Sequence, residues 1–60
     1  MAFAIPLELL DPERKDDFLL WVAGLPIHPE DKKQLCLEWS AWTGVYLTHD
    51  DYVLAGADAV

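Results

Sequence analysis

The feature that most constrains the fold is a stripe of large apolar side chains in the second half of the chain. Leu35, Trp39, Trp42 and Tyr46 fall at positions i, i+4, i+7 and i+11, which places them on one side of a helix with a period near 3.6 residues. The stretch from Glu30 to Tyr46 also holds two of the three tryptophans and the only cysteine. We therefore expect a helix here whose apolar side builds the core.

The length of the chain limits how much core that stripe can build. Sixty residues form at most one domain, spanning 1–60, and a domain of this size buries only about 60% of the surface that its unfolded chain exposes. Cys36 has no partner cysteine, so no internal disulfide can compensate. Hydrophobic residues still make up 53% of the chain. Many of them must lie partly at the surface, where a contiguous apolar patch usually marks an interface.

The net charge narrows the choice of partner. Eleven acidic residues against four basic ones give −7, which disfavours direct contact with nucleic acid or an anionic membrane, because both are polyanions. The same charge permits binding to a basic protein surface, including one that normally holds DNA or RNA. The simpler interpretation is that excess acid keeps a small apolar protein soluble.

The sequence shows no sign of a membrane span or an export signal. No stretch reaches the roughly 20 apolar residues that a spanning helix needs. The first residues lack the basic start of a signal peptide, and Glu8 and Asp11 follow early. Together with the single unpaired cysteine, this pattern favours a reducing, cytoplasmic setting.

The first half of the chain has well-marked helix boundaries. Residues 1–10 are mostly apolar and contain Pro6, which indicates an extended lead-in. Asp11 is a good N-cap, Pro12 suits the first helical position, and Gly24 is a plausible end. These signals predict a first helix between Asp11 and Gly24.

One part of this first helix is apolar at every position. Phe18 to Ala23 contains no polar side chain, so a helix here is hydrophobic all round. Either this segment enters the middle of the fold, or one side of it meets another chain. A buried strand over Phe18–Val22 is the competing interpretation.

The second half carries signals for two more helices. Pro29 is suited to open one helix and Gly44 to end it. Thr48 and Asp51 are spaced as a capping box for a short third helix. Gly56 marks the end of that helix.

The predicted fold is therefore all-α. We expect a small bundle of two main helices and a short third, with an extended N-terminal lead-in over 1–10 and a frayed tail over 57–60. The alternative is an α+β fold in which residues 3–7 pair with 45–47 as two short strands.

The aromatic side chains are the candidate apolar contacts with a partner. Tryptophan is frequent among interface anchors because it buries a large rigid area at low entropic cost, although core packing is the ordinary role of each one singly. Base stacking would need positive charge around them, and only Lys32 and Lys33 are near, beside several acids. The candidates are Trp21, Trp39, Trp42 and Tyr46.

The acidic side chains are the second set of candidate contacts. They gather at or near predicted helix N-termini, where negative charge stabilises the helix by about 0.3–1 kcal/mol each. That local role accounts for most of them without a partner. The alternative is an acidic face that occupies a basic groove. The candidates are Asp16, Asp17, Glu30, Asp31, Asp50 and Asp51.

No pattern of residues predicts a metal, a cofactor or a reaction. His49 beside Asp50 and Asp51 could supply ligands, but adjacent residues on a helix point in different directions, and zinc sites want three or four convergent ligands. Cys36 could be drawn as a nucleophile with a histidine, yet a lone helical cysteine is usually a small buried hydrophobe. We therefore expect no metal, no cofactor and no catalysis.

The function favoured by the sequence is that of a small acidic intracellular protein-binding module. It would dock on a larger protein through a Trp-containing surface with acid at its edge, for example as an inhibitor or regulator of a nucleic-acid-handling protein. The alternative is a structural subunit that forms a homo-oligomer, such as a dimer, through the same Trp-rich surface.

Overall fold

Helical segments account for all the regular structure in residues 5–57, which are the residues that the computed structural model describes. Two 3-10 turns come first, followed by three α-helices: η1 (Leu7–Leu9), η2 (Pro12–Arg14), α1 (Lys15–Ala23), α2 (Pro29–Thr43) and α3 (His49–Leu54). The all-α prediction is confirmed. Residues 5–7 and 45–47 form no strands, and residues 3 and 4 of the alternative pairing lie outside the described part of the chain.

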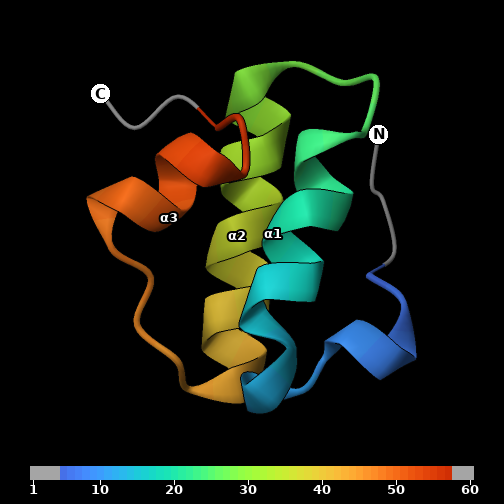
Figure 1. The fold of residues 1–60 in the computed structure, drawn as a ribbon, viewed down its shortest axis with the longest axis vertical. Helices are drawn as coiled ribbons and strands as arrows, with labels where there is room; N and C mark the ends of the chain where they lie inside the picture. The colour runs from blue at the N-terminus through green and yellow to red at the C-terminus, as the bar shows by residue number, and fades with distance from the viewer. Residues whose placement is uncertain (1–4, 58–60) are drawn as a thin grey trace.

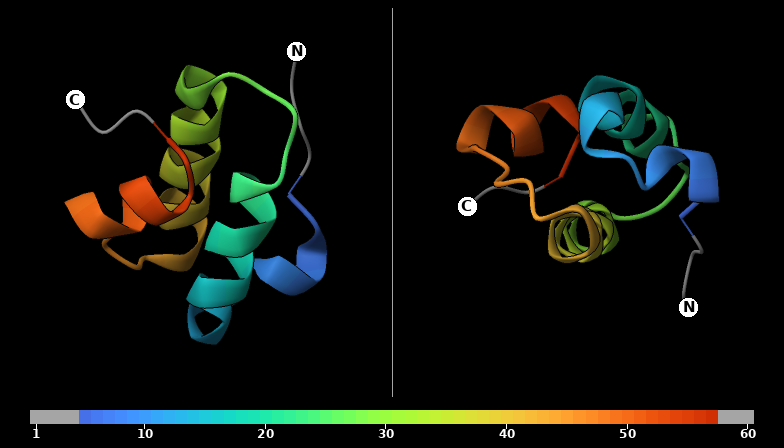
Figure 2. Two further views of the ribbon diagram at one scale, coloured as in Figure 1. Left: turned by 45° about the horizontal axis from the view of Figure 1, so that its top comes forward. Right: turned by 90° about the horizontal axis from the view of Figure 1, so that it is seen from below.

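The helices form two layers. One layer is α2, and the other holds α1 between α3 and η1 (Figure 1 and Figure 2). Figure 1 shows α1 and α2 running side by side in opposite directions, while α3 crosses the pair at a steep angle. In the view from below in Figure 2, α2 is seen end-on beneath a row made by α3, α1 and η1. α1 contacts both other α-helices and both 3-10 turns. The helix that is apolar all round is therefore the central element of the fold.

The start of α1 follows from local capping. The carboxylate of Asp11 accepts a hydrogen bond from the Glu13 amide at 2.9 Å, and Pro12 occupies the first position of η2, so the chain enters the helix through one 3-10 turn. Phe18, Leu19 and Val22 are then fully buried. The strand interpretation of Phe18–Val22 is wrong, because this segment is α-helical throughout.

α2 begins at Pro29 and ends before a left-handed glycine. The His28 side chain forms no capping hydrogen bond, while Gly44 has φ 75° and donates its amide to the Ser40 carbonyl at 2.9 Å. Glycine adopts this backbone conformation at no steric cost. Because the helix ends at Thr43, Tyr46 is not on it. The prediction that Tyr46 continues the helical stripe of Leu35 is therefore wrong.

α3 is short and is fixed by polar contacts at its start. Thr48 and Asp51 form the predicted capping box: the Thr48 amide donates to the Asp51 carboxylate at 2.9 Å, and the Asp51 amide donates to the Thr48 hydroxyl at 3.3 Å. The same carboxylate accepts a hydrogen bond from the Lys15 ammonium at 3.4 Å. One carboxylate thus caps α3 and ties it to α1.

The core is centred on a stacked aromatic pair. The rings of Phe18 in α1 and Trp39 in α2 lie 5.0 Å apart with 11° between their planes, which is close to the offset-stacked arrangement that aromatic pairs favour. The Trp39 indole N–H donates to the Leu9 carbonyl. This bond fixes the N-terminal segment, where η1 takes the place of the fully extended lead-in expected from Pro6.

The end of the chain also departs from the sequence-based expectation. Ala57 belongs to the segment expected to fray, yet it is buried and its amide donates to the Tyr52 carbonyl at 3.0 Å. Gly56, with φ 73°, makes the turn that returns Ala57 to the core. Residues 58–60 lie outside the described part of the chain.

A lysine completes the packing where two helices end. Lys32 of α2 is 9% exposed, and its ammonium donates to the carbonyl of Ala23, the last residue of α1, at 2.9 Å. A Cβ added to Gly56, just beyond α3, would lie 3.2 Å from the same ammonium nitrogen. The cation therefore sits beside the C-terminal ends of α1 and α3, where the helix dipoles favour positive charge.

Candidate functional site

Two of the four aromatic candidates belong to the core. Trp39 is fully buried against Phe18, so it is not on the surface and the expectation that it contacts a partner needs correction. Trp21 is half-buried, with its ring centroid 6.0 Å from that of Phe18. Both have an internal packing role, because the small core depends on its few large side chains.

Trp42 is exposed although it lies only three residues after Trp39. Its side chain is 76% exposed. It lies in the last turn of α2, at the edge of the buried helical face and in line with Leu35. Figure 1 shows that η2 and the start of α1 lie at this end of the molecule, and they contribute the charged run from Glu13 to Asp17 rather than apolar side chains. Trp42 therefore stays largely in solvent at this end of the helix pair.

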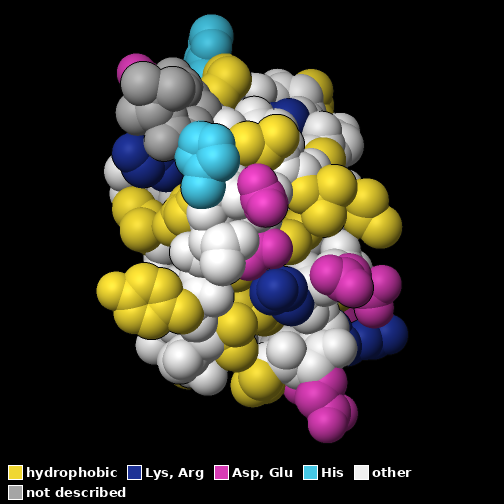
Figure 3. Space-filling view, turned by 60° about the vertical axis from the view of Figure 1, so that its left-hand side comes forward, with side chains coloured by type: hydrophobic (Ala, Val, Ile, Leu, Met, Phe, Trp, Pro, Cys, Tyr) yellow, Lys and Arg dark blue, Asp and Glu magenta, His cyan; other side chains and the backbone are white. Residues whose placement is uncertain are grey.

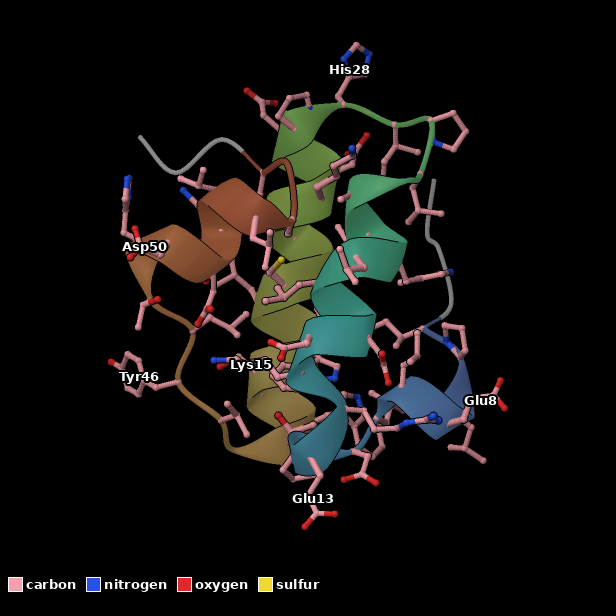
Figure 4. All side chains as sticks on the ribbon, in the orientation of Figure 1. Glu8, Glu13, Lys15, His28, Tyr46 and Asp50 are labelled. Atoms are coloured by element: carbon pink, nitrogen blue, oxygen red, sulfur yellow. The ribbon has the colours of Figure 1, made fainter. Side chains whose placement is uncertain are left out.

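Tyr46 is still more exposed, and the turn that carries it is held firmly. The Val45 amide donates to the Thr43 hydroxyl at 3.3 Å, and the Val45 carbonyl accepts from the Ser40 hydroxyl at 2.6 Å. Val45 is partly buried and Leu47 is buried, so the residue between them points outward, as alternation in extended backbone requires. Tyr46 is accordingly 94% exposed and projects away from the body of the protein in Figure 4.

Trp42 and Tyr46 thus lie on either side of the Gly44 turn, and we call them the aromatic end. The polar contacts of Ser40 and Thr43 fix the backbone between the two rings. An anchor that is ordered before binding loses less conformational freedom on association. The hydrogen-bonded turn therefore holds the backbone of the aromatic end in place and lowers this part of the ordering cost of binding.

The acidic candidates occupy three separate places. Asp16 and Asp17 lie in the first turn of α1, at the end of the molecule where Figure 4 labels Glu13. Glu30 and Asp31 lie in the first turn of α2, beside His28 at the opposite end. Asp50 lies on α3. The antiparallel packing of α1 and α2 separates the first two groups, so the six acids do not form one continuous face.

The six acids also differ in how far they are engaged within the protein. Asp51 has the capping and Lys15 contacts already described, and the hydrogen bond from the Thr48 amide is the main reason why its pKa lies below its ordinary value. Asp17 pairs with Arg14 at 3.4 Å. Asp16, Glu30, Asp31 and Asp50 are exposed. Asp51 is therefore a structural residue, while these four remain open to solvent.

The C-terminus of α2, beside the aromatic end, has no cation of its own. α2 has no basic residue in its last turn, so the partial negative charge of its C-terminus is not offset by its own side chains. Arg14 and Lys15, near the start of α1, are paired with Asp17 and Asp51. By contrast, the C-terminus of α1 has the Lys32 ammonium at its last carbonyl.

Other large apolar side chains are exposed away from the aromatic end. Figure 3 shows apolar side chains on one flank in separate groups, with charged and polar groups between them, rather than as one broad patch. Isolated exposed apolar residues are ordinary in small proteins. Besides Trp42 and Tyr46, the exposed set is Leu7, Leu20, Leu37, Val53 and Leu54.

The described residues offer little for metal chemistry. Among residues 5–57 no group of three or more His, Cys, Asp or Glu side chains is placed to hold a metal ion. Cys36 is buried in the core. Burial, with a smaller contribution from the charge of Asp51, raises the pKa of its thiol to about 11, so the thiol is protonated at neutral pH and packs as a small hydrophobe.

Comparisons with protein-family models, with curated proteins and with solved structures found no match to this chain. Over residues 5–57, none of the helices has the length and apolar character needed to cross a membrane.

The structure also shows residues whose roles the sequence analysis missed. From the sequence, Lys32 was named only as a cation near the tryptophans, although it stands three residues before Leu35 and seven before Trp39, on the same helical face. That spacing could have indicated its burial. The exposure of Leu20 had a similar signal, because Asp16 and Asp17 stand four and three residues before it, on the same helical face.

Proposed function

We propose that the protein is a small acidic binding module that acts inside the cell without catalysis, by docking on a larger protein. The observation that carries this proposal is the exposure of Trp42 and Tyr46, 76% and 94%, on either side of a turn that hydrogen bonds hold in place. Large aromatic side chains are enriched among the residues that dominate binding energy at protein interfaces. A small protein that exposes two of them at one end has a ready anchor.

The charge of the protein supports a basic partner. The net charge is −7, and the side chains of Arg14, Lys15 and Lys32 are engaged with groups of the same chain. Complementary charge steers association and selects among partners. One concrete form of the proposal is an inhibitor or regulator that covers a basic surface of a nucleic-acid-handling protein.

The second candidate is a structural subunit that forms a homo-oligomer. The exposed Leu20, Leu37, Val53 and Leu54 favour it, because even separate apolar side chains stabilise an association when a second copy removes them from water. Light scattering over a range of protein concentrations distinguishes the two. A monomer leaves the aromatic end free for another protein, whereas a dimer that is lost in Trp42→Ala would assign that surface to self-association.

The docking proposal is tested by site-specific cross-linking. A photoreactive amino acid replaces Tyr46 in one variant and His28, an exposed residue at the opposite end of the molecule in Figure 4, in the matched control. We expect a discrete adduct with a larger protein from position 46 and a much weaker one from position 28. The identified protein is then purified, and its affinity is measured for the wild type and for Trp42→Ala and Tyr46→Ala.

Truncation of an anchor residue to alanine should weaken that affinity by about thirtyfold or more. The same adduct yield at both positions would contradict docking through the aromatic end. Unchanged affinity of both alanine variants for the purified partner would contradict it as well.

A further inference from the structure

We infer that the aromatic end binds arginine side chains presented on the surface of its partner. This inference rests on the proposed function and names the chemistry that the docking surface selects. It is drawn from the combination of two exposed aromatic rings with the C-terminal carbonyl groups of α2 and exposed carboxylates in the same part of the molecule. Neither feature alone would specify the partner.

The aromatic rings provide the first half of the argument. Trp42 and Tyr46 are the most exposed aromatic side chains of the described residues, and the faces of both ring types attract cations. The Gly44 turn, fixed by the Ser40 and Thr43 hydroxyls, presents them without a large ordering cost. A cation over such a face is held most strongly when it is planar and weakly hydrated, as a guanidinium is.

The surrounding charge provides the second half. The last turn of α2 contains no basic residue, so its carbonyl end keeps a partial negative charge. Asp16, exposed in the first turn of α1, lies at the same end of the molecule, and Glu38 precedes Trp42 by one helical turn and is exposed. Carbonyl and carboxylate oxygens accept the several N–H groups that a guanidinium directs in one plane.

A second copy of this chain does not supply that chemistry. Arg14 is its only arginine, and the guanidinium is already within 3.4 Å of the Asp17 carboxylate and 3.5 Å of the Glu8 carbonyl. Two copies, each with a net charge of −7, also repel one another. The occupant that fits is therefore a different protein with arginine on its contact surface.

The test uses a short poly-arginine peptide and a poly-lysine peptide of equal length as probes, followed by two-dimensional NMR of the full chain. We expect the arginine peptide to shift the signals of Trp42 and Tyr46 more than those of Glu30 and Asp31, which lie at the opposite end. The arginine peptide should bind about two- to fivefold more tightly than the lysine peptide. Trp42→Ala should keep the fold and lose that preference.

Three results would overturn the inference: no binding of either peptide, equal or tighter binding of lysine, or shifts centred on Glu30 and Asp31. If cross-linking from position 46 finds a partner while the peptides show no arginine preference, the docking proposal stands and the arginine inference fails. If cross-linking finds no partner and neither peptide binds, both fail.

Discussion

Along α2 a lysine is buried and a tryptophan is exposed, the reverse of what the polarity of the two side chains predicts. Lys32 is 9% exposed because its ammonium donates to the last carbonyl of α1 and its side chain packs beside Gly56, just beyond α3. Trp42 is 76% exposed in the last turn of α2, at the end of the bundle where the charged start of α1 lies (Figure 1). In so small a protein, the neighbouring element decides whether a side chain is buried. A buried polar residue therefore identifies a contact that holds helices together, and an exposed aromatic residue identifies a surface that is open to a partner.

The largest expected effect separates Trp39 from Trp42. Trp39→Ala removes one ring of the central stack and the indole bond to Leu9, and such truncations cost about 3–5 kcal/mol. A domain of this size has a total stability of about 3–9 kcal/mol, so Trp39→Ala should lose at least about a third of its free energy of unfolding. Trp42→Ala should change stability by less than about 0.5 kcal/mol.

Urea denaturation followed by circular dichroism measures both variants. Equal losses in the two would mean that Trp42 is as important to the core as Trp39. That result would remove the contrast between the two parts of α2.

The next effect concerns the buried lysine. Lys32→Met keeps the aliphatic chain and removes only the ammonium, which leaves the Ala23 carbonyl without its donor. Hydrogen bonds to charged groups contribute about 1.5–3 kcal/mol, and we expect a loss in free energy of unfolding within that range. Lys33→Met, at the adjacent half-buried position, is the matched control and should stay within about 0.5 kcal/mol.

Chemical denaturation of the two methionine variants gives the comparison. If Lys32→Met is as stable as the wild type, the hydrogen bond from the Lys32 ammonium only offsets the free-energy cost of removing that ammonium from water. Lys32 would then be a tolerated charge rather than a lock between helices.

A smaller effect is expected at the two left-handed glycines. Gly44 and Gly56 have φ 75° and 73°, where an alanine costs roughly 1–2 kcal/mol. A Cβ on Gly44 would meet nothing within 4 Å, whereas one on Gly56 would lie 3.2 Å from the Lys32 nitrogen. Gly56→Ala should therefore destabilise the protein more than Gly44→Ala.

A double-mutant cycle isolates the part of this loss that involves the lysine. In the Lys32→Met background the excess cost of Gly56→Ala should shrink. An excess that is the same in both backgrounds would show that Lys32 does not pack against the end of α3.

The last expected effect is a change of slope with pH, at Cys36 on the buried face of α2. Its folded-state pKa is raised to about 11, while that of an unfolded cysteine is about 8.5. The unfolded chain therefore loses the proton first. The stability that Cys36 contributes is complete below about pH 8.5 and is lost as pH rises toward 11.

Thermal unfolding measured across this alkaline range in the wild type and in Cys36→Ala tests the prediction. The variant should show a shallower decline below pH 10, where the Tyr52 hydroxyl, whose pKa is also raised mainly by burial, has little effect. Parallel declines in the two proteins would contradict a buried, protonated thiol.

Much of the fold was predictable because its signals are local. Asp11 with Pro12, Gly44, and the Thr48–Asp51 capping box each fix a helix boundary through contacts within a few residues. The candidate site was predictable only in part. Trp42 and Tyr46 were named together with Trp39 because helical spacing alone does not say where the partner helix ends.

The sequence by itself determined the helix boundaries, the all-α class and the acidic charge, because capping, left-handed glycine and composition act over short range or over the whole chain. Only the tertiary structure decided that Trp39 is buried and Trp42 is not, that Lys32 lies beside the ends of two helices, and that the acids of α1 and α2 lie at opposite ends. The physical reason is that burial depends on the neighbouring element, and the antiparallel packing of α1 against α2 sets which side chains meet.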